Sequence, residues 1–366
     1  MTSDPKTTTP VSGILTVVIT TSPTPSAPST ELLSLVFQSF QKYCPSLLEC
    51  RLIVVLDTYD KVAETPRLKR GVVTAQIACD FELYKANVKE LVLAKYLEHQ
   101  SHVSATRSSG EAEYGSAGCE DNVVNVSICQ FYDERVTFIE PVQRLGFGLA
   151  VRSALRIVKT PYVHVHQHDW TLEVDIPVAS ILDVMQAHES DINIPVKYIC
   201  LPSIRLLEYA TQDDVVRFLT LRELTSSLKR DFIPSPLQGI SVPLTPLFFW
   251  HDKPHIASTK HYLACIFPST LAMPRGAFIE DTVGQRARTQ MKEGKWHKWA
   301  CWLYYPAEGR QLCLRHLKGR VWRGVEAEMK QKEIWKAQNA GAEPLEDIAV
   351  VAEVNLENLF SSQLLL

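Results

Sequence analysis

The feature that most constrains the fold is a strand, a helix and a second strand in the first 60 residues. Residues 13–21, GILTVVITT, form a β-branched apolar run of strand length that suits burial on both faces. Residues 29–43 then place apolar side chains at helical spacing, and residues 50–60, CRLIVVLDTYD, form a second apolar run. Because this order is that of a βαβ unit, it predicts a parallel sheet with helices on its faces.

The same alternation continues along the chain. Further strands are predicted at residues 124–132, 135–141, 161–167, 196–203 and 260–268. Helices are predicted at residues 74–99, 145–158, 175–188, 211–231, 276–295 and 323–340. We therefore expect an α/β fold with a central, mostly parallel sheet, helices on both faces and a C-terminal helical extension.

Local composition divides the chain into segments. Residues 1–12 are rich in Thr and Pro, which predicts a disordered tail. Residues 13–322 are expected to form one α/β domain, and residues 323–366 the helical extension. Within the domain, residues 101–122 are rich in Ser, Gly, Ala and Glu, which predicts a flexible surface insertion.

The overall composition argues against several classes of protein. With 366 residues, 46% of them apolar, the chain can bury a sizeable core. Its net charge of −3 gives no electrostatic basis for a nucleic-acid partner. The nine cysteines are odd in number and include no Cys-x-x-Cys, which indicates neither a disulfide framework nor a zinc site. A polar start without a signal peptide, and no apolar run of roughly 18 residues, predict a cytoplasmic protein without a membrane span.

Polar side chains follow three of the predicted strands at the point where each strand ends. Open parallel sheets bind ligands beyond the carboxyl ends of their strands, so these side chains are candidates for a binding site. The third of these strands is the most unusual, because its sequence PYVHVHQHD places three histidines and an aspartate at the end of an apolar run. The candidates are Thr20, Thr21 and Ser22, then Asp57 and Asp60, and then Gln167, His168 and Asp169.

The order of these motifs resembles the nucleotide-sugar-dependent glycosyltransferases with the GT-A fold, closest to their large family-2 group. The first strand of that family ends in a Thr/Ser loop, as in VVITTS, and the second ends in an acidic residue, as in LIVVLD. A Gly-rich turn, a helix and a strand that ends in an Asp-x-Asp motif follow, as in residues 143–169. An acidic pair and a C-terminal histidine complete the pattern, as in GAFIEDTVGQ and CLRHLKGR.

The resemblance assigns a role to each matching residue. It implies that the acidic pair Glu280 and Asp281 supplies the catalytic base, and that Asp169 and His316 hold a metal ion. The residues that it implies in nucleotide-sugar binding are Thr20, Thr21, Ser22, Asp57, Arg144, Gly146, Arg152, Gln167, His168 and Asp169.

The metal implied by the resemblance is Mn²⁺ or Mg²⁺, but the motif departs from the family at one position. Gln167 stands where the family has its first aspartate, whereas Asp169 keeps the second. Oxygen ligands suit both ions, and Mn²⁺ also accepts an imidazole. Without a metal, cationic side chains would have to neutralise the departing diphosphate. The candidates for that role are Arg144, Arg152, Lys318 and Arg320.

Several of these residues also have purely structural explanations, which the sequence leaves open. His164 and His166 lie inside the predicted strand and are typical of hydrogen-bonded core histidines. Asp57 can serve as a turn or helix-cap residue. Glu280 and Asp281 can stabilise the N-terminus of the following helix through its dipole.

The resemblance implies a hexosyltransferase-like enzyme that moves a sugar from a nucleotide-sugar donor to an acceptor, with inversion at the anomeric carbon. The acceptor, whether glycan, protein or small molecule, is not indicated. One alternative is a sugar nucleotidyltransferase, although TTSPTPSAPST lacks the glycines and basic residues that such enzymes carry after the first strand. The other is a non-catalytic nucleotide- or sugar-binding module, which the glutamine at position 167 favours.

Overall fold

The computed structural model describes residues 10–97, 104–116, 119, 121–234, 240–269 and 271–338. The chain divides into two compact units, Met1–Trp322 and Arg323–Leu366. The second unit contributes one described helix, α12 (Val325–Gln338). Most of the predicted disordered tail lies outside the described residues, and Val11 already begins helix α1.

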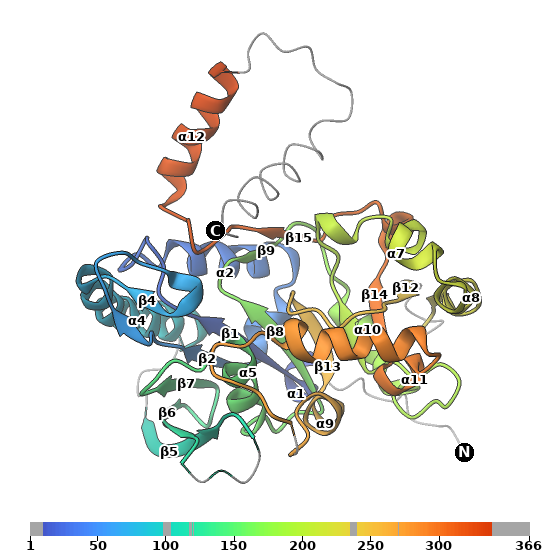
Figure 1. Cartoon of the computed structure of the whole chain (residues 1–366), viewed down its shortest axis with the longest axis horizontal. Helices are drawn as coiled ribbons and strands as arrows, with labels where there is room; N and C mark the ends of the chain where they lie inside the picture. Colours follow the sequence, from blue (N-terminus) through green and yellow to red (C-terminus); the bar gives the residue numbers. More distant parts are fainter. Residues whose placement is uncertain are drawn as a thin grey trace. The chain divides into compact units, whose positions relative to one another are not determined.

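An eleven-stranded sheet forms the core of the first unit within the described residues (Figure 1). Its strands run in the spatial order β11-β12-β14-β10-β13-β8-β1-β2-β7-β6-β5. Their bounds are β1 (Leu15–Thr21), β2 (Arg51–Leu56), β5 (Ala105–Glu113), β6 (Val123–Phe131), β7 (Val136–Pro141), β8 (Tyr162–Gln167), β10 (Tyr198–Cys200), β11 (Arg230–Phe232), β12 (Val242–Pro246), β13 (His255–Ser258) and β14 (Cys301–Tyr304).

Helices flank this sheet, as the sequence predicts. The helices of the first unit in the described part of the chain are α1 (Val11–Ile14), α2 (Glu31–Tyr43), α3 (Ser46–Glu49), α4 (Ala75–Leu97), α5 (Phe147–Leu155), α6 (Val178–His188), α7 (Asp213–Val216), α8 (Leu219–Leu228), α9 (Thr259–His261), α10 (Gln285–Lys292) and α11 (Trp296–Trp299). Helix α5 contacts β1 and β2, and Phe40 of α2 packs edge-on against the rings of His164 and His166 in β8. None of the helices in the described part of the chain combines the length and the apolar character that a bilayer crossing requires.

The four central strands, β8, β1, β2 and β7, are mutually parallel, so their carboxyl ends meet at one edge of the sheet. All seven residues of β1 are buried, which explains why this strand carries a continuous β-branched run instead of alternating polar residues. Thr20 pairs with Val55 on one side and with Gln167 on the other. This register brings the candidate residues after β1, β2 and β8 together.

The outer strands add antiparallel pairs that the sequence did not predict. In place of the flexible insertion expected at residues 101–122, residues 105–113 form β5, which pairs with β6 along its whole length. The segment 260–268, predicted as a strand, is instead helical, with α9 followed by a π-helical turn (Tyr262–Ile266). Ser258 caps this helix by accepting a hydrogen bond from the backbone N–H of His261.

Two short strands outside the main sheet bring distant parts of the chain together. Strand β9 (Trp170–Leu172) follows β8 directly, and β15 (Leu314–His316) pairs with it antiparallel. In this register His316 lies opposite Trp170, one position after Asp169. A second small ribbon, β3 (Lys61–Val62) with β4 (Val72–Val73), follows β2.

Candidate active site

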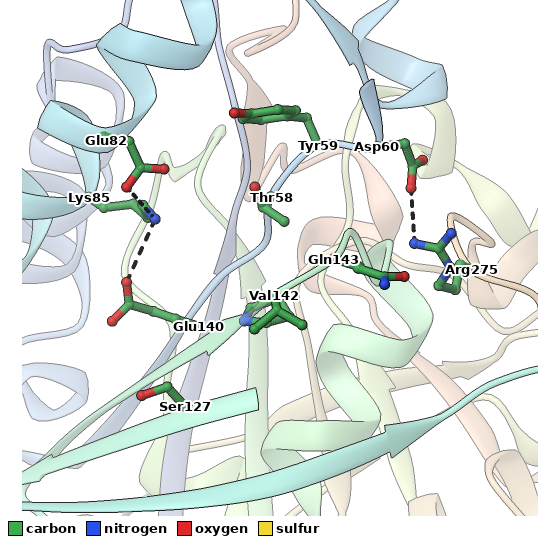
Figure 2. Close-up of a pocket in the computed structure, with 11 residues that line it drawn as sticks. Thr58, Tyr59, Asp60, Glu82, Lys85, Ser127, Glu140, Val142, Gln143 and Arg275 are labelled. Atoms are coloured by element: carbon green, nitrogen blue, oxygen red, sulfur yellow. Dashed lines mark hydrogen bonds and ion pairs between the residues drawn. The ribbon is translucent and has the colours of Figure 1, made fainter. Parts of the chain in front are cut away.

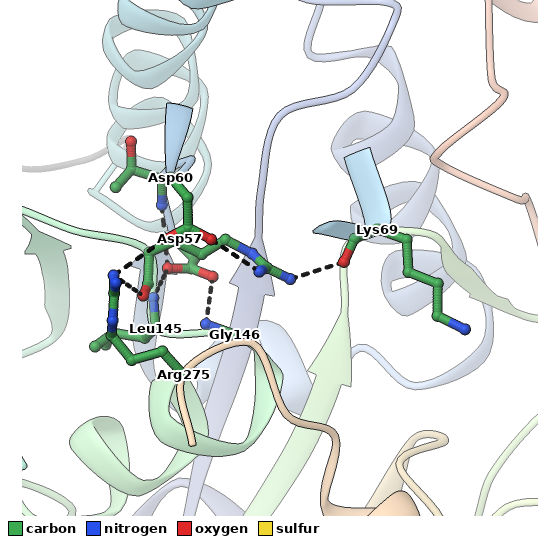
Figure 3. Close-up of polar contacts among 8 residues, drawn as sticks. Asp57, Asp60, Lys69, Leu145, Gly146 and Arg275 are labelled. Atoms are coloured by element: carbon green, nitrogen blue, oxygen red, sulfur yellow. Dashed lines mark hydrogen bonds and ion pairs between the residues drawn. The ribbon is translucent and has the colours of Figure 1, made fainter. Parts of the chain in front are cut away.

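Asp57 joins the end of β2 to the turn that starts α5 (Figure 3). Its Oδ1 accepts a hydrogen bond from the backbone N–H of Leu145 at 2.7 Å, and its Oδ2 accepts one from Gly146 at 2.9 Å. The side chain is buried. Both carboxylate oxygens are therefore used within the protein, which is the capping role that the sequence left open beside nucleoside binding.

Gly146 occupies a position that no other residue fits. Its φ is +81°, and a Cβ atom there would lie 2.6 Å from the backbone nitrogen of Gly276. Gly276 in turn donates its N–H to the carbonyl of Leu145 at 2.7 Å. The turn at 145–146 and the segment at 275–277 are thus held in direct backbone contact.

Asp60 carries two ion pairs beside this turn. Its Oδ2 lies 3.1 Å from Nη1 of Arg144, and its Oδ1 lies 3.0 Å from Nη1 of Arg275. Arg144 also donates to the carbonyl of Lys69 at 2.9 Å, and Arg275 to the carbonyl of Arg144 at 3.2 Å (Figure 3). Two guanidinium groups therefore stand at the carboxyl end of β2, held by one carboxylate.

Asp169 forms the second group of contacts, at the carboxyl end of β8. Its Oδ2 lies 3.0 Å from Nε2 of His316 and accepts the backbone N–H of Gly319 at 3.0 Å. The ring of His316 stacks on Trp170 with centroids 4.5 Å apart, which fixes its orientation. The other oxygen, Oδ1, is buried and has no partner among the described residues. A buried acceptor of this kind is available to a ligand.

The electrostatics of this group favour an ionised Asp169. Burial by itself would raise the pKa of the Asp169 carboxyl, but the charge and hydrogen bond of His316, with smaller contributions from His168 and Gly319, bring it below its usual value. Burial lowers the pKa of His168, whose Nδ1 also lacks a partner within the described residues. At neutral pH the Asp169 carboxylate is therefore negatively charged, and the imidazole of His168 beside it is neutral.

The implied metal ion can be tested against these residues. No group of three or more His, Cys, Asp or Glu side chains in the described ranges is arranged to hold an ion. The unpartnered Asp169 Oδ1 fits an ion whose coordination substrate phosphates and water would complete, whereas His316 Nε2 would have to leave Asp169 Oδ2 to serve as a second ligand. Gln167 is not part of it, because its side-chain amide donates to the backbone carbonyl of Asp252 at 2.9 Å.

Glu280 and Asp252 form a reciprocal pair at the start of the helical segment Glu280–Gly284. The backbone N–H of Asp252 donates to Glu280 Oε2 at 3.4 Å, and the backbone N–H of Glu280 donates to Asp252 Oδ2 at 3.3 Å. His251 Nδ1 lies 3.8 Å from the same Oε2. Glu280 is thus held in one orientation by residues of the preceding loop, whereas Asp281 is exposed.

The two carboxyl groups of this pair have opposite pKa shifts. Burial, and then the negative charge of Glu280, raise the pKa of Asp252 well above its usual value. Burial opposes ionisation of Glu280 as well, but the nearby His251, at 3.8 Å, and the charge of Lys253 bring its pKa below the usual value. Burial lowers the pKa of His251 to about 4. Of the two carboxyl groups, Glu280 therefore ionises the more readily and Asp252 holds its proton the more tightly.

One short segment connects the three groups. Arg275 contacts Asp60, the ring of Phe278 lies 5.3 Å below the guanidinium of Arg320, and Glu280 contacts Asp252. Arg320 also lies within electrostatic range of Asp169 and Arg144. The segment 275–280 therefore contacts both the loop after β2 and Asp252, and the charge of Arg320 links it to Asp169 at the end of β8.

The remaining predicted residues occupy different places. Thr20 accepts the backbone N–H of His168 through its carbonyl at 3.1 Å, and Thr21 shares a hydrogen bond of 2.7 Å with the hydroxyl of Tyr84. Ser22 follows β1 and is half-buried. Arg152 lies apart from the other cationic groups, because it donates to the backbone carbonyl of Glu113 in β5.

The histidines inside β8 have structural roles. His164 Nε2 lies 3.2 Å from His166 Nδ1, and His166 Nε2 lies 2.8 Å from the carbonyl of Trp170. Burial lowers the pKa of both rings, to about 4 for His166. These side chains are neutral core groups that orient the strand end beside Asp169.

Sequence reasoning missed Asp252, His251 and Arg275 as parts of the site. The dipeptide His251-Asp252 directly follows the apolar run LFFW. A polar pair at the end of such a run was a usable signal for a site residue. Arg275 lies five residues before Glu280, in a loop without periodicity, and is followed by a glycine. The sequence gives no comparable signal for it.

Stability should depend on pH through Asp57. Burial raises the pKa of Asp57 to about 6, although the Leu145 and Gly146 amides oppose this shift. The folded state thus holds the proton more tightly than the unfolded chain, whose Asp pKa is about 3.9. The contribution of Asp57 to the free energy of unfolding should therefore fall by up to about 3 kcal/mol between pH of about 4 and about 6.

Asp57→Asn removes this titration, so its free energy of unfolding relative to that of the wild type should rise with pH over the same range. Urea unfolding at both ends of the range measures the difference, with the exposed Asp231→Asn as a control. A relative stability that falls with pH would instead mean that the two amides outweigh the cost of burying the anion.

Comparison with known proteins gives structural matches only. No family model matches the sequence, and no curated protein matches it. TarS of S. aureus is 11% identical over 93% of this chain, with a TM-score of 0.40, and this chain spans 42% of the TarS chain. The mannosyltransferase PcManGT from Pyrobaculum calidifontis, solved in complex with GDP-Man and Mn²⁺, is 11% identical over 98% of this chain and 84% of its own, with a TM-score of 0.36.

Proposed function

We propose that this protein transfers a sugar from a nucleotide-sugar donor to an acceptor hydroxyl. The observations that support the proposal are an oriented carboxylate, Glu280, and the buried Asp169–His316 pair at the carboxyl end of β8. Glycosyl transfer requires both elements, since a base must take the acceptor proton and a second group must bind the departing diphosphate.

The donor end of the site carries the positive charge that a diphosphate needs. Arg144 and Arg275 stand at the end of β2. The charge of Arg320 interacts with the charges of Asp169 and Arg144. Guanidinium groups bind phosphate oxygens in a bidentate manner and stay charged at all physiological pH values. A Mn²⁺ or Mg²⁺ ion, held by Asp169 and His316, would add further charge against the leaving diphosphate.

The acceptor end of the site supplies the base. The pKa of Glu280 is below its usual value and that of Asp252 is well above its own, so Glu280 is the group of the pair that more readily carries the negative charge and can take a proton. His251 Nδ1 lies 3.8 Å from Glu280 Oε2. Because the pKa of His251 is lowered to about 4, its imidazole is neutral and does not compete with Glu280 for the acceptor proton. We therefore assign the base role to Glu280 rather than to the exposed Asp281.

Nucleotide binding is the first test of the proposal. A thermal-shift screen with UDP, GDP, CDP and their sugars, with and without Mn²⁺ or Mg²⁺, should show one nucleotide raising the melting temperature by a few degrees near saturation. Asp169→Asn should remove the metal-dependent part of that shift, because the amide is a poor ligand for a hard cation.

The matched control for Asp169→Asn is Asp191→Asn, at a half-buried position away from the site. A shift that needs no metal in the wild type would leave the diphosphate to Arg144, Arg275 and Arg320. Absence of a shift with every nucleotide, from protein whose circular dichroism shows it to be folded, would contradict the proposal.

A non-catalytic binding module is the second candidate, and one observation favours it. Gln167, at the position of the family's first metal-binding aspartate, is used to hold the backbone of Asp252. A nucleotide that binds without turnover in the presence of every acceptor tried would support this candidate.

A further inference from the structure

A polar groove of about 910 Å³ lies next to the proposed donor site (Figure 2). It is formed by the loop after β2, one face of α4, the middle of β6, and the end of β7 with the residues after it. Its lining residues are Thr58, Tyr59, Asp60, Glu82, Lys85, Ser127, Glu140, Pro141, Val142, Gln143 and Arg275. Asp60 and Arg275 also belong to the donor site, so the two regions share one wall.

The charged side chains of the groove are paired with one another. Lys85 lies 2.7 Å from Glu82 and 3.9 Å from Glu140 on one wall, and Arg275 lies 3.0 Å from Asp60 on the other. Figure 2 shows the two groups of ion pairs on opposite sides of the groove. Among the lining residues three carboxylates, Asp60, Glu82 and Glu140, face two cationic groups, Lys85 and Arg275. The groove therefore gives no net attraction to an anionic ligand, whereas its charged groups can donate to and accept from a neutral one.

Between the two walls lie groups that suit a hydroxyl-rich ligand. The hydroxyls of Thr58, Tyr59 and Ser127 and the amide of Gln143 make no hydrogen bond to another described residue. Figure 2 places Tyr59 and Val142 on facing sides of the space, and Val142 is 67% exposed. An aromatic ring and an aliphatic side chain offer apolar surface to the carbon face of a sugar ring, while the polar groups bind its hydroxyls.

We infer that this groove binds a neutral oligosaccharide chain. Its volume is at the upper end of the range for small-molecule sites, which suits more than one sugar ring. The assignment of the bound chain as the acceptor glycan rests on the proposed function, because the groove adjoins the donor site at Asp60 and Arg275 but is not lined by Glu280. The saccharide site itself rests only on the groove.

The test uses the full chain and isothermal titration with four neutral hexasaccharides: maltohexaose, cellohexaose, mannohexaose and chitohexaose. We expect one of them to bind with a Kd of about 1 mM or below. Val142→Arg places a long charged side chain in the groove and should weaken that binding at least tenfold. Ile192→Arg is the matched control, because Ile192 is 88% exposed and does not line the groove. Tyr59→Ala, the second variant, should weaken binding as well.

The outcomes separate this inference from the proposed function. No binding of any of the four at roughly 10 mM, or equal binding by Val142→Arg and Ile192→Arg, would overturn the saccharide site. Loss of the nucleotide-induced thermal shift in Val142→Arg, without loss of saccharide binding, would assign the groove to the nucleotide and would also overturn it. Saccharide binding that Val142→Arg abolishes, in a protein that binds no nucleotide, would keep the saccharide site and reject the transferase.

Discussion

Replacing Glu280 with Gln is expected to lower the rate of sugar transfer by about 10²–10⁴-fold, the usual contribution of a general base. The glutamine keeps the size of the side chain and can still accept the backbone N–H of Asp252, so the local structure should persist. What it loses is the negative charge that takes the acceptor proton. Steady-state kinetics, with the acceptor that titration identifies, measure the change in kcat.

The matched control for this variant is Asp281→Asn, the exposed neighbour that the sequence could not distinguish from Glu280. Its rate should stay within about threefold of the wild type, because an exposed carboxylate lacks the orienting contacts of a base. Nucleotide binding should be unchanged in both variants. A larger rate loss in Asp281→Asn than in Glu280→Gln would reassign the base, and a loss of nucleotide binding in Glu280→Gln would place Glu280 in donor binding instead.

Replacing Gly146 with Ala is expected to cost about 2–6 kcal/mol of stability. The backbone there has a φ of +81°, which is strained for any residue with a Cβ atom, and the new atom would meet the backbone nitrogen of Gly276 at 2.6 Å. The strain alone costs about 1–3 kcal/mol, and the enforced separation of two packed backbones adds a similar amount. Urea unfolding measures the loss.

Gly294 provides the control, because its φ of +82° is nearly the same but no atom lies within 4 Å of the place that a Cβ atom would take. Gly294→Ala should therefore show the strain of about 1–3 kcal/mol without the clash. Equal losses in the two variants would show that the segment 275–277 moves away easily. In that case the donor site would not depend on the backbone contact between Gly146 and Gly276.

The central strands could be predicted from sequence because burial on both faces leaves a continuous apolar run, as in β1 and β2. Residues 260–268 show the limit of that signal. A short apolar run suits a helix equally well, and Tyr262 and Ile266, four positions apart, are buried on one helical face. Strand β5 gave no apolar signal at all, because most of its side chains are exposed at the edge of the sheet.

Site residues at the ends of buried strands could be predicted from the sequence, whereas site residues in loops distant in the chain could not. Asp57 and Asp169 follow buried strands, so topology alone places them at one edge of the sheet. Asp252 and Arg275 reach the site from loops whose positions depend on the packing of β13 and of the segment after it. Arg152 was predicted in the site and does not contribute to it. It has the spacing that the resemblance requires, but its guanidinium donates to the backbone of β5, a strand that the sequence did not predict.

The pairing of β9 with β15 gives the order in which the site is completed. Asp169 receives its two hydrogen-bond partners from His316 and Gly319, which lie 147 and 150 residues later in the chain. During synthesis the central strands β1, β2 and β8 leave the ribosome well before those partners do. Because Met1–Trp322 is one compact unit and domains generally fold as units, the donor site is complete only after residues 316–319 have joined the rest of the unit.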